Sequence, residues 1–231
     1  MIEQAVIIAG GLATRLYPVT KKIPKSMIEI NGKPFIDHQL KLLKNNGIEK
    51  VVVCAGYLGE MVEEYVGDGS NWDLDVKFSF DGEKLLGTGG AVRKSIAMLD
   101  ERFFVIYGDS YLPVDFRKVA AYFENNDKSA LMTVIQNGDR WDKSNVIFEN
   151  GCIVKYDKKD KSPEMKHIDY GLGIFRKEVF EKINENDVVD LADIYKDLLK
   201  KNKLAGYEIF ERFYEIGSFS GIEELKLLLK K

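Results

Sequence analysis

The residues between Gly10 and Lys25 combine the groups that proteins use to hold phosphate. Gly10 and Gly11 directly follow an apolar run, and a glycine backbone can approach a ligand closely and point its N–H groups at phosphate oxygens. Arg15 offers a planar fork of donors, and Lys25 offers a compact, mobile positive charge. Together they indicate that this segment binds a phosphorylated ligand.

A plainer interpretation is a tight turn after a strand, followed by solvated lysines. For two glycines alone that interpretation would be the better one, but an arginine and a Pro-Lys pair at these spacings favour phosphate binding. The stretch does not match the P-loop motif G-x-x-x-x-G-K-[ST] or the dinucleotide-binding motif G-x-G-x-x-G. The ligand is therefore held by a different kind of phosphate loop.

The first half of the chain predicts the elements that position this loop. Apolar runs alternate with helical patterns, which is typical of an α/β fold with a mainly parallel, twisted sheet and helices on both faces. The predicted strands are residues 2–9, 51–54, 75–80 and 102–107, and the predicted helices are residues 34–46, 58–66 and 88–99. Asp109 follows the last of these strands. Because ligands of such sheets bind beyond the carboxyl ends of the strands, we expect Asp109 and the glycine turn to meet there.

The second half has a different pattern, with short strands and turn signals that predict a small antiparallel extension of the sheet. The predicted strands are residues 130–135, 145–148, 152–156 and 168–175. Two helices follow, at residues 190–201 and 220–230, and Asp190 and Ser220 are the predicted N-caps.

Composition excludes several classes of protein. The chain has 231 residues and a net charge of −3, so it lacks the basic field of a nucleic-acid-binding protein. It has no apolar run of about 20 residues, as a membrane span requires, and no secretory signal pattern. The two histidines, His38 and His167, do not form a Cys/His metal motif. We expect one cytoplasmic domain without nucleic-acid or membrane partners.

The segment from Gly10 to Lys25 reads GGLATRLYPVTKKIPK and resembles the opening signature of the sugar nucleotidylyltransferases, roughly GGxGTRLxPxTxxxPK. The stretches LGTGGA (residues 86–91), GDS (residues 108–110) and FYEIGS (residues 213–218) extend the resemblance along the chain. Family members have a glycosyltransferase-A-like α/β fold, and this chain resembles the short ones. One departure is Ala13, where the family has a third glycine. If the backbone at that position is in the left-handed conformation, alanine destabilises the fold by roughly 1 kcal/mol relative to glycine.

The resemblance implies transfer of a nucleotidyl group from a nucleoside triphosphate to a sugar 1-phosphate, with Mg²⁺ and release of diphosphate. A phosphate monoester is already a nucleophile, so catalysis needs positioning and charge neutralisation rather than a general base. Arg15 matches the arginine that holds the triphosphate, and Lys25 matches the lysine between the two substrates' phosphates. Asp109 matches the metal aspartate. Glu215 replaces the family's second metal aspartate, and its longer side chain can still reach a metal.

The resemblance also implies two sets of binding residues in a single domain, with a nucleotide-binding half at residues 1–127 and an acceptor-binding half at residues 128–231. The nucleotide set is Ala9, Gly10, Gly11, Leu12, Ala13, Thr14, Arg15, Glu83, Gly87 and Thr88. The acceptor set is Gly108, Tyr111, Lys158, Asp169, Tyr170 and Gly171. Asp157-Lys158 resembles the family's Glu-Lys pair without its following proline, so a solvated hairpin lysine is an equal alternative for Lys158.

Three functions remain open at this point. The first is a guanylyltransferase that uses GTP and heptose 1-phosphate to make a precursor of capsule or other surface polysaccharide. The second is a cytidylyltransferase that acts on a non-sugar phosphate such as phosphocholine or a phosphorylated amino acid. The third is an inactive nucleotide or sugar sensor, which the presence of Arg15, Lys25 and Asp109 disfavours. The sequence does not fix the base, the acceptor, feedback regulation, or whether the chain forms a homo-oligomer.

Overall fold

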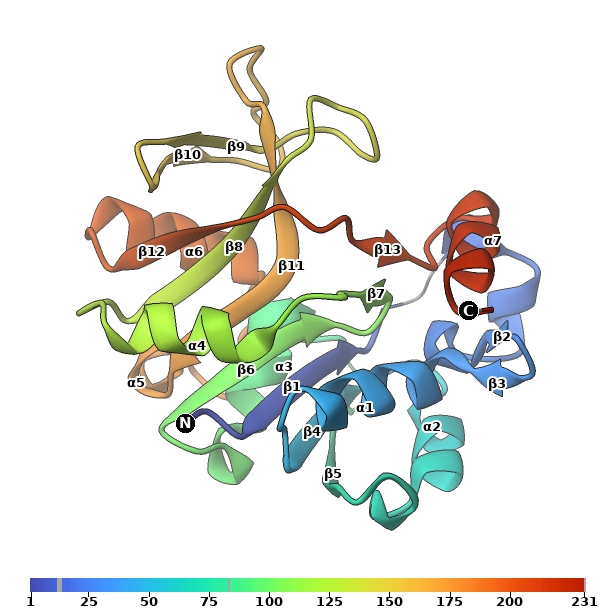
Figure 1. Cartoon of the computed structure of the whole chain (residues 1–231). Coiled ribbons are helices and arrows are strands. Elements are labelled where there is room, and N and C mark those ends of the chain that lie inside the picture. Colours follow the sequence, from blue (N-terminus) through green and yellow to red (C-terminus); the bar gives the residue numbers. More distant parts are fainter. Residues whose placement is uncertain (12–13, 83, 231) are drawn as a thin grey trace.

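A mixed sheet of nine strands runs through the computed structural model, which describes residues 1–11, 14–82 and 84–230 (Figure 1). The expectations for Leu12, Ala13 and Glu83 lie outside the described residues. The main path of the sheet is β10-β9-β11-β6-β1-β4-β5, and β8 pairs with β11 and β12. The nine strands are β1 (Gln4–Ala9), β4 (Lys50–Ala55), β5 (Asp75–Phe80), β6 (Arg102–Tyr107), β8 (Ala130–Gln136), β9 (Val146–Glu149), β10 (Cys152–Tyr156), β11 (His167–Arg176) and β12 (Leu204–Ile209).

The strands of the first half are parallel, as predicted. β1 pairs with β4 on one side and with β6 on the other, and β4 pairs with β5. The chain therefore leaves β1 in one direction, to β4 and β5, and returns on the other side as β6. A crevice at such a reversal is where open α/β sheets bind ligands, beyond the carboxyl ends of the strands.

The predicted antiparallel extension is confirmed. β11 runs antiparallel to β6, β8 and β9, and β9 pairs antiparallel with β10. Strand β12 was not predicted, and it pairs in parallel with β8. Its sequence LAGYEI is short and contains a glycine, so the local pattern gives little strand signal.

Helices cover both faces of the sheet, as predicted, with α1 and α4 in front and α3 and α6 behind in Figure 1. The helices are α1 (Phe35–Asn45), α2 (Gly59–Val66), α3 (Gly87–Lys94), α4 (Phe116–Glu124), α5 (Glu178–Glu181), α6 (Leu191–Lys200) and α7 (Phe219–Leu228). Each face has its own apolar core: one contains residues of α1, α2 and α4, and the other contains residues of α3, α5 and α6. No helix in the described part of the chain is long and apolar enough to cross a membrane.

A third, smaller core joins the loop after β1 to the end of the chain. Leu16 packs in one cluster with Ile216 and with Leu225 of α7. The cap of α7 corrects the prediction: its N-cap is Ser218, whose Oγ accepts from Gly221 N at 3.0 Å, and not Ser220. The predicted cap Asp190 is confirmed for α6.

Candidate active site

Asp109 lies directly after β6 and forms an ion pair with Lys25. Lys25 Nζ is 2.6 Å from Asp109 Oδ2, and the two side chains are 17% and 35% exposed. Ser110 Oγ donates to the other carboxylate oxygen at 3.3 Å. Lys25 begins the short 3₁₀ helix η3 (Lys25–Met27). The fold thus joins the phosphate loop to the end of β6, as the strand-end argument predicted.

Gln39 of α1 fixes the turn that carries Asp109. This fully buried side chain donates from Nε2 to the carbonyl oxygens of Tyr107, at 2.9 Å, and of Ser110, at 2.8 Å. Hydrogen bonds to both ends of the turn restrain its backbone. The sequence analysis missed Gln39, although a polar residue three positions after Ile36 on an apolar helix stripe was a usable signal.

Glu215 reaches the same turn from near the end of the chain. Strand β13 (Tyr214–Glu215) pairs antiparallel with β7 (Ser110–Tyr111), which places Glu215 opposite Ser110. Ile216 N donates to the carbonyl oxygen of Asp109 at 2.9 Å. This backbone pairing makes Asp109 and Glu215 neighbours across the ladder.

Two cavities adjoin this turn. The β1–β6 cavity, of about 180 Å³, lies at the ends of those strands, and the β11–β13 cavity, of about 580 Å³, lies beside it. Tyr107 and Asp109 line both cavities, so the two meet at Asp109. The β1–β6 cavity is also lined by Ala9, Gly11, Lys25, Thr88 and Gly108. The β11–β13 cavity is also lined by Arg15, Lys158, Asp169, Tyr170, Gly171 and Glu215.

Most of the predicted nucleotide residues that line a cavity line the β1–β6 cavity, and most of the predicted acceptor residues line the β11–β13 cavity. Gly108, which we assigned to the acceptor, lines the β1–β6 cavity, and Arg15, assigned to the nucleotide, lines the β11–β13 cavity. Tyr111 is not among the lining residues of either cavity and pairs with Tyr214 in the β7–β13 ladder. The individual binding roles stay predictions.

Strand β11 has a bulge where it borders the β11–β13 cavity. Its pairing with β8 shifts register between Asp169 and Gly173. Gly171, inside the shift, has a left-handed φ of +95°, and a Cβ there would lie 3.4 Å from the ring of Tyr107. Asp169 Oδ1 accepts from Gly171 N at 3.0 Å, and its Oδ2 accepts from Tyr156 OH at 3.5 Å. Burial raises the pKa of the Asp169 carboxyl. A bulge of this kind re-aims the strand at a site.

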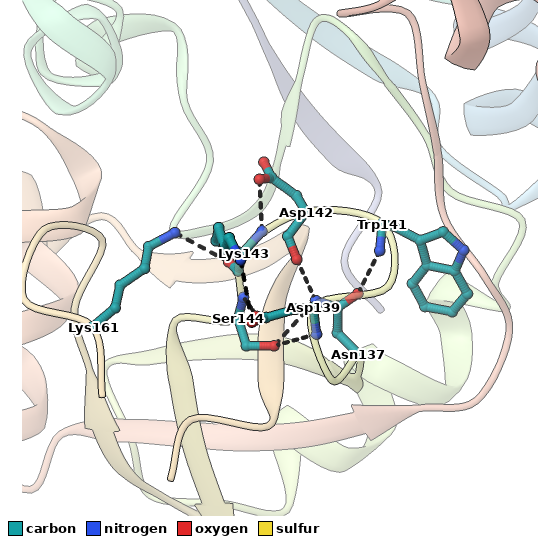
Figure 2. A network of polar contacts seen from close by, with 7 residues as sticks. All are labelled: Asn137, Asp139, Trp141, Asp142, Lys143, Ser144 and Lys161. Carbon is teal, nitrogen blue, oxygen red and sulfur yellow. Dashed lines mark hydrogen bonds and ion pairs between the residues drawn. The ribbon is translucent and has the colours of Figure 1, made fainter. Parts of the chain in front are cut away.

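The loop between β8 and β9 places Trp141 in the wall of the same cavity. Figure 2 shows the polar network that fixes this loop, with the Trp141 ring directed away from it. Asn137 Nδ2 donates to Asp142 O at 2.6 Å and to Ser144 Oγ at 3.1 Å. Asn137 Oδ1 accepts from Trp141 N at 3.1 Å, and Asp139 Oδ1 accepts from Ser144 N at 2.7 Å.

Two arginines lie over Trp141. The Cζ atoms of Arg140 and Arg212 are 5.4 and 5.3 Å from the centre of its ring. Arg212 also pairs with Glu224 of α7, whereas the Arg140 side chain has no ion pair with the residues that the structure describes. Guanidinium groups over an aromatic ring are attracted to its π face. This wall of the β11–β13 cavity therefore carries one guanidinium that is paired with Glu224 and one that has no ion pair with the described residues, a feature that the sequence analysis missed.

The glycine-rich stretch at residues 86–91 begins α3 and packs against the segment before α6. Val189 O accepts from the N–H groups of Gly89, at 2.8 Å, and Gly90, at 3.1 Å. A Cβ at Gly87, whose φ is +75°, would lie 2.7 Å from the same oxygen. The close neighbour of these glycines is thus the chain itself, which the sequence did not predict. Thr88 is the residue of this stretch that lines the β1–β6 cavity.

Known proteins share this arrangement over the whole chain. The profile of the family described as Nucleotidyl transferase matches residues 4–231. The chain belongs to the nucleotidyl transferase family. It is therefore a nucleotidyltransferase, an enzyme that transfers a nucleotidyl group.

Two relatives of this nucleotidyltransferase share one activity. The chain is 29% identical to the D-glycero-alpha-D-manno-heptose 1-phosphate guanylyltransferase of Campylobacter jejuni over 215 residues, which cover 93% of this chain and 94% of the relative. It is 30% identical to that of Aneurinibacillus thermoaerophilus over 222 residues, 93% of both chains. The structure of HddC from Yersinia pseudotuberculosis, complexed with GMP-PN, has the same fold, with a TM-score of 0.82 and 23% identity over 99% of this chain and all of that one.

Asp109 and Glu215 remain the predicted Mg²⁺ ligands of this nucleotidyltransferase, and two carboxylates suit that ion. Proteins commonly hold Mg²⁺ by one or two carboxylates, and waters and substrate phosphates complete its shell. The described residues contain no cluster of three or more His, Cys, Asp or Glu side chains that could hold a metal ion. At present Lys25 pairs with Asp109, and Ser218 Oγ donates to Glu215 Oε1 at 2.7 Å.

Proposed function

We propose that this nucleotidyltransferase uses Mg²⁺ and GTP to convert heptose 1-phosphate into GDP-heptose, with release of diphosphate, for surface polysaccharide synthesis. The observation that carries the proposal is the convergence of Arg15, Lys25, Asp109 and Glu215 on two cavities that meet at Asp109. Two cavities are what a reaction between two phosphorylated substrates needs. Similarity over more than 90% of the chain to two heptose 1-phosphate guanylyltransferases supports the choice of substrates.

In this proposal the nucleotide phosphates lie in the β1–β6 cavity and the acceptor lies in the β11–β13 cavity. An oxygen of the acceptor phosphate attacks the α-phosphorus, and the bond from the α-phosphorus to the bridging oxygen breaks as diphosphate leaves. Lys25 moves from Asp109 to the phosphates between the two cavities, and Arg15, which lines the β11–β13 cavity, holds the triphosphate where the two cavities meet. Asp109 and Glu215 would hold Mg²⁺, which would neutralise part of the phosphate charge.

The structure offers one observation against the cytidylyltransferase alternative with a cationic acceptor. Arg140 and Arg212 already lie over Trp141, one of the aromatic rings of the β11–β13 cavity that could receive a quaternary ammonium group. Arg212 is paired with Glu224, but the Arg140 guanidinium, which has no ion pair with the described residues, disfavours such a cation at this ring. An acceptor with hydroxyl groups has no such conflict, which favours a sugar phosphate.

The first experiment is a thermal-shift series with Mg²⁺ and each of GTP, CTP, UTP, dTTP and ATP. A ligand at a hundred times its dissociation constant stabilises the native state by about 2.7 kcal/mol, which raises the Tm by a few degrees. We expect GTP to give the largest shift, and product analysis with heptose 1-phosphate to show GDP-heptose. The Asp109→Asn variant should keep its fold and lose turnover. A larger shift with another base would replace the proposed nucleotide, and no shift with any of the five would contradict the proposal.

A further inference from the structure

Asp157 and Lys158 are consecutive residues that line different cavities. Lys158 lines the β11–β13 cavity, where the acceptor is proposed to bind. Asp157 lines a separate cavity of about 590 Å³ between β10 and α6, together with Lys196 of α6. The resemblance matched the two residues to a Glu-Lys pair, but the structure separates their side chains.

The Asp157 carboxylate holds the turn in which Lys158 lies. Its Oδ1 accepts from Lys159 N at 2.8 Å and from Asp160 N at 2.9 Å. Its Oδ2 lies 2.7 Å from Lys196 Nζ, and the two side chains are only 19% and 26% exposed. Lys196, followed by the two N–H groups, holds the pKa of Asp157 well below its usual range. The carboxylate is thus fixed on one side by α6, and on the other it fixes the backbone around Lys158.

Lys158 needs such a fixed backbone because little else orders its side chain. It is exposed, and its Nζ lies 3.4 Å from Tyr107 OH and 5.3 Å from the centre of that ring. A long, exposed lysine loses rotamer entropy when it is held in one place. The backbone of the turn sets the direction of the Lys158 Cα–Cβ bond. That direction therefore determines which positions the ammonium group reaches most readily.

The other end of α6 reaches the β1–β6 cavity. Thr88 Oγ1 donates to Asp190 Oδ1 at 3.1 Å and accepts from Leu191 N at 2.8 Å, so Thr88 joins the N-cap of α6. Thr88 lines the β1–β6 cavity. One short helix therefore contacts Thr88 of the β1–β6 cavity through its N-cap Asp190, and through Lys196 it contacts Asp157, the residue before Lys158 of the β11–β13 cavity.

We propose that Lys196 and Asp157 are positioning residues that aim Lys158 at the phosphate of the acceptor, with α6 as the common support of both substrate sites. This inference rests on the proposed function, because it concerns the acceptor of that reaction. Lys196 itself contacts no substrate and acts through Asp157 and the turn at residues 158–160.

The test compares six variants of the enzyme in steady-state assays with heptose 1-phosphate and GTP: four that alter α6 or Asp157, Lys158→Ala, and the double variant Lys158→Ala/Lys196→Met. Lys196→Met removes the ion pair and keeps the length of the side chain, and Lys196→Arg is the conservative rescue. Lys200→Met is the matched control, because Lys200 lies one turn further along α6, lines the same cavity and has no ion pair with the described residues. Asp157→Asn weakens the pair from the other side.

We expect Lys196→Met and Asp157→Asn to raise the KM of the acceptor about tenfold and to change the KM of GTP less than twofold, since a small misplacement of a binding group has large effects. Lys200→Met should match the wild type, and Lys196→Arg should restore most of the affinity. In the Lys158→Ala background, Lys196→Met should have no further effect, because a residue that acts through another is not additive with it. An unchanged acceptor KM, or additive losses in the double variant, would overturn the proposal.

A second measurement separates this inference from the proposed function. ¹⁵N relaxation of the amides at residues 158–160 should show greater mobility in Lys196→Met than in the wild type and in Lys200→Met, with or without substrate. If the wild type transfers no nucleotidyl group to any acceptor tried, the proposed function is wrong. The relaxation experiment still shows in that case whether Lys196 orders the turn at residues 158–160. Equal order in all three proteins would overturn that role.

Discussion

Lys25 Nζ lies 2.6 Å from Asp109 Oδ2, at the point where the two cavities meet. The lysine predicted to bind phosphate thus neutralises the carboxylate predicted to bind metal. In the proposed function the phosphates attract the Lys25 ammonium and the metal needs the Asp109 carboxylate. We therefore expect Lys25 and Asp109 to separate when substrate and metal bind.

Replacement of Lys25 by Met should have opposite effects on metal binding and on turnover. Without nucleotide, Mn²⁺ should bind the Lys25→Met variant about tenfold more tightly, because a charge-assisted hydrogen bond of about 1.5–3 kcal/mol no longer competes for Asp109. Transfer should fall more than about 100-fold, because the bridge between the phosphates is lost. Calorimetric titration with Mn²⁺ and a turnover assay measure the two effects. Lys22→Met, which changes an exposed lysine of the same loop, should alter neither, and weaker Mn²⁺ binding to Lys25→Met would contradict the prediction.

Replacement of Gln39 by Leu should reduce both stability and turnover. Leucine keeps the approximate volume but leaves the carbonyl oxygens of Tyr107 and Ser110 without their donor. We expect a loss of about 2–4 kcal/mol in the free energy of unfolding, measured in urea, because unpaired buried polar groups cost about 1–3 kcal/mol each. Turnover should also fall, because Asp109 lies in the turn that Gln39 no longer restrains. Gln136→Leu, on an exposed residue of β8, is the control, and equal stability of the two variants would refute the role of Gln39.

Replacement of Gly171 by Ala should affect the acceptor more than the nucleotide. At a φ of +95° an L-residue is strained, so we expect a loss of about 1–2 kcal/mol of stability. The new methyl group would also lie 3.4 Å from the ring of Tyr107, inside the site. The KM of the acceptor should therefore rise while that of GTP changes little. Gly138→Ala provides a control with positive φ but open space around the new methyl group, and it should leave both KM values unchanged.

Replacement of Asp169 by Asn should change the pH dependence of stability in a defined direction. Burial raises the pKa of Asp169 in the folded state above its value in the unfolded chain, near 3.9. Between these two pKa values the folded state binds more protons than the unfolded state, so the free energy of unfolding of the wild type falls as pH rises. Asparagine does not titrate, and it can still accept from Gly171 N.

The difference in Tm between Asp169→Asn and the wild type should therefore shift in favour of the variant as the pH rises from 4, and should become constant once the folded-state pKa is passed. Thermal melts at half-unit pH steps measure this. A difference that stays constant from pH 4 to pH 8 would show that Asp169 is not destabilised by its surroundings. In the same variant, the kcat/KM of the acceptor should fall if Asp169 contacts its hydroxyl groups.

The sequence by itself determined the phosphate loop and the class of fold. Gly10, Arg15 and Lys25 lie within 16 residues, and the apolar runs before Gly10 and before Asp109 are readable from local patterns. The rule that parallel strands bind ligands at their carboxyl ends then placed Asp109 near the loop. Strand β12 was not predicted, because its local pattern is weak. Helix α4 was missed although its N-cap Asp115 and the helical spacing of Phe116, Val119, Ala120 and Phe123 are readable in the sequence.

Only the tertiary structure decided which distant side chains complete the site. Gln39 lies 68 residues before Tyr107, and the β7–β13 ladder joins Ser110 to Glu215. Lys196 meets Asp157 because α6 packs behind the sheet beside β10. The local sequence does not identify the partners in these pairs, because the partners are brought together by the order of strands in the sheet and by the packing of the helices on it. Local chemistry thus identifies the candidate phosphate-binding residues, and topology selects the residues that hold them in place.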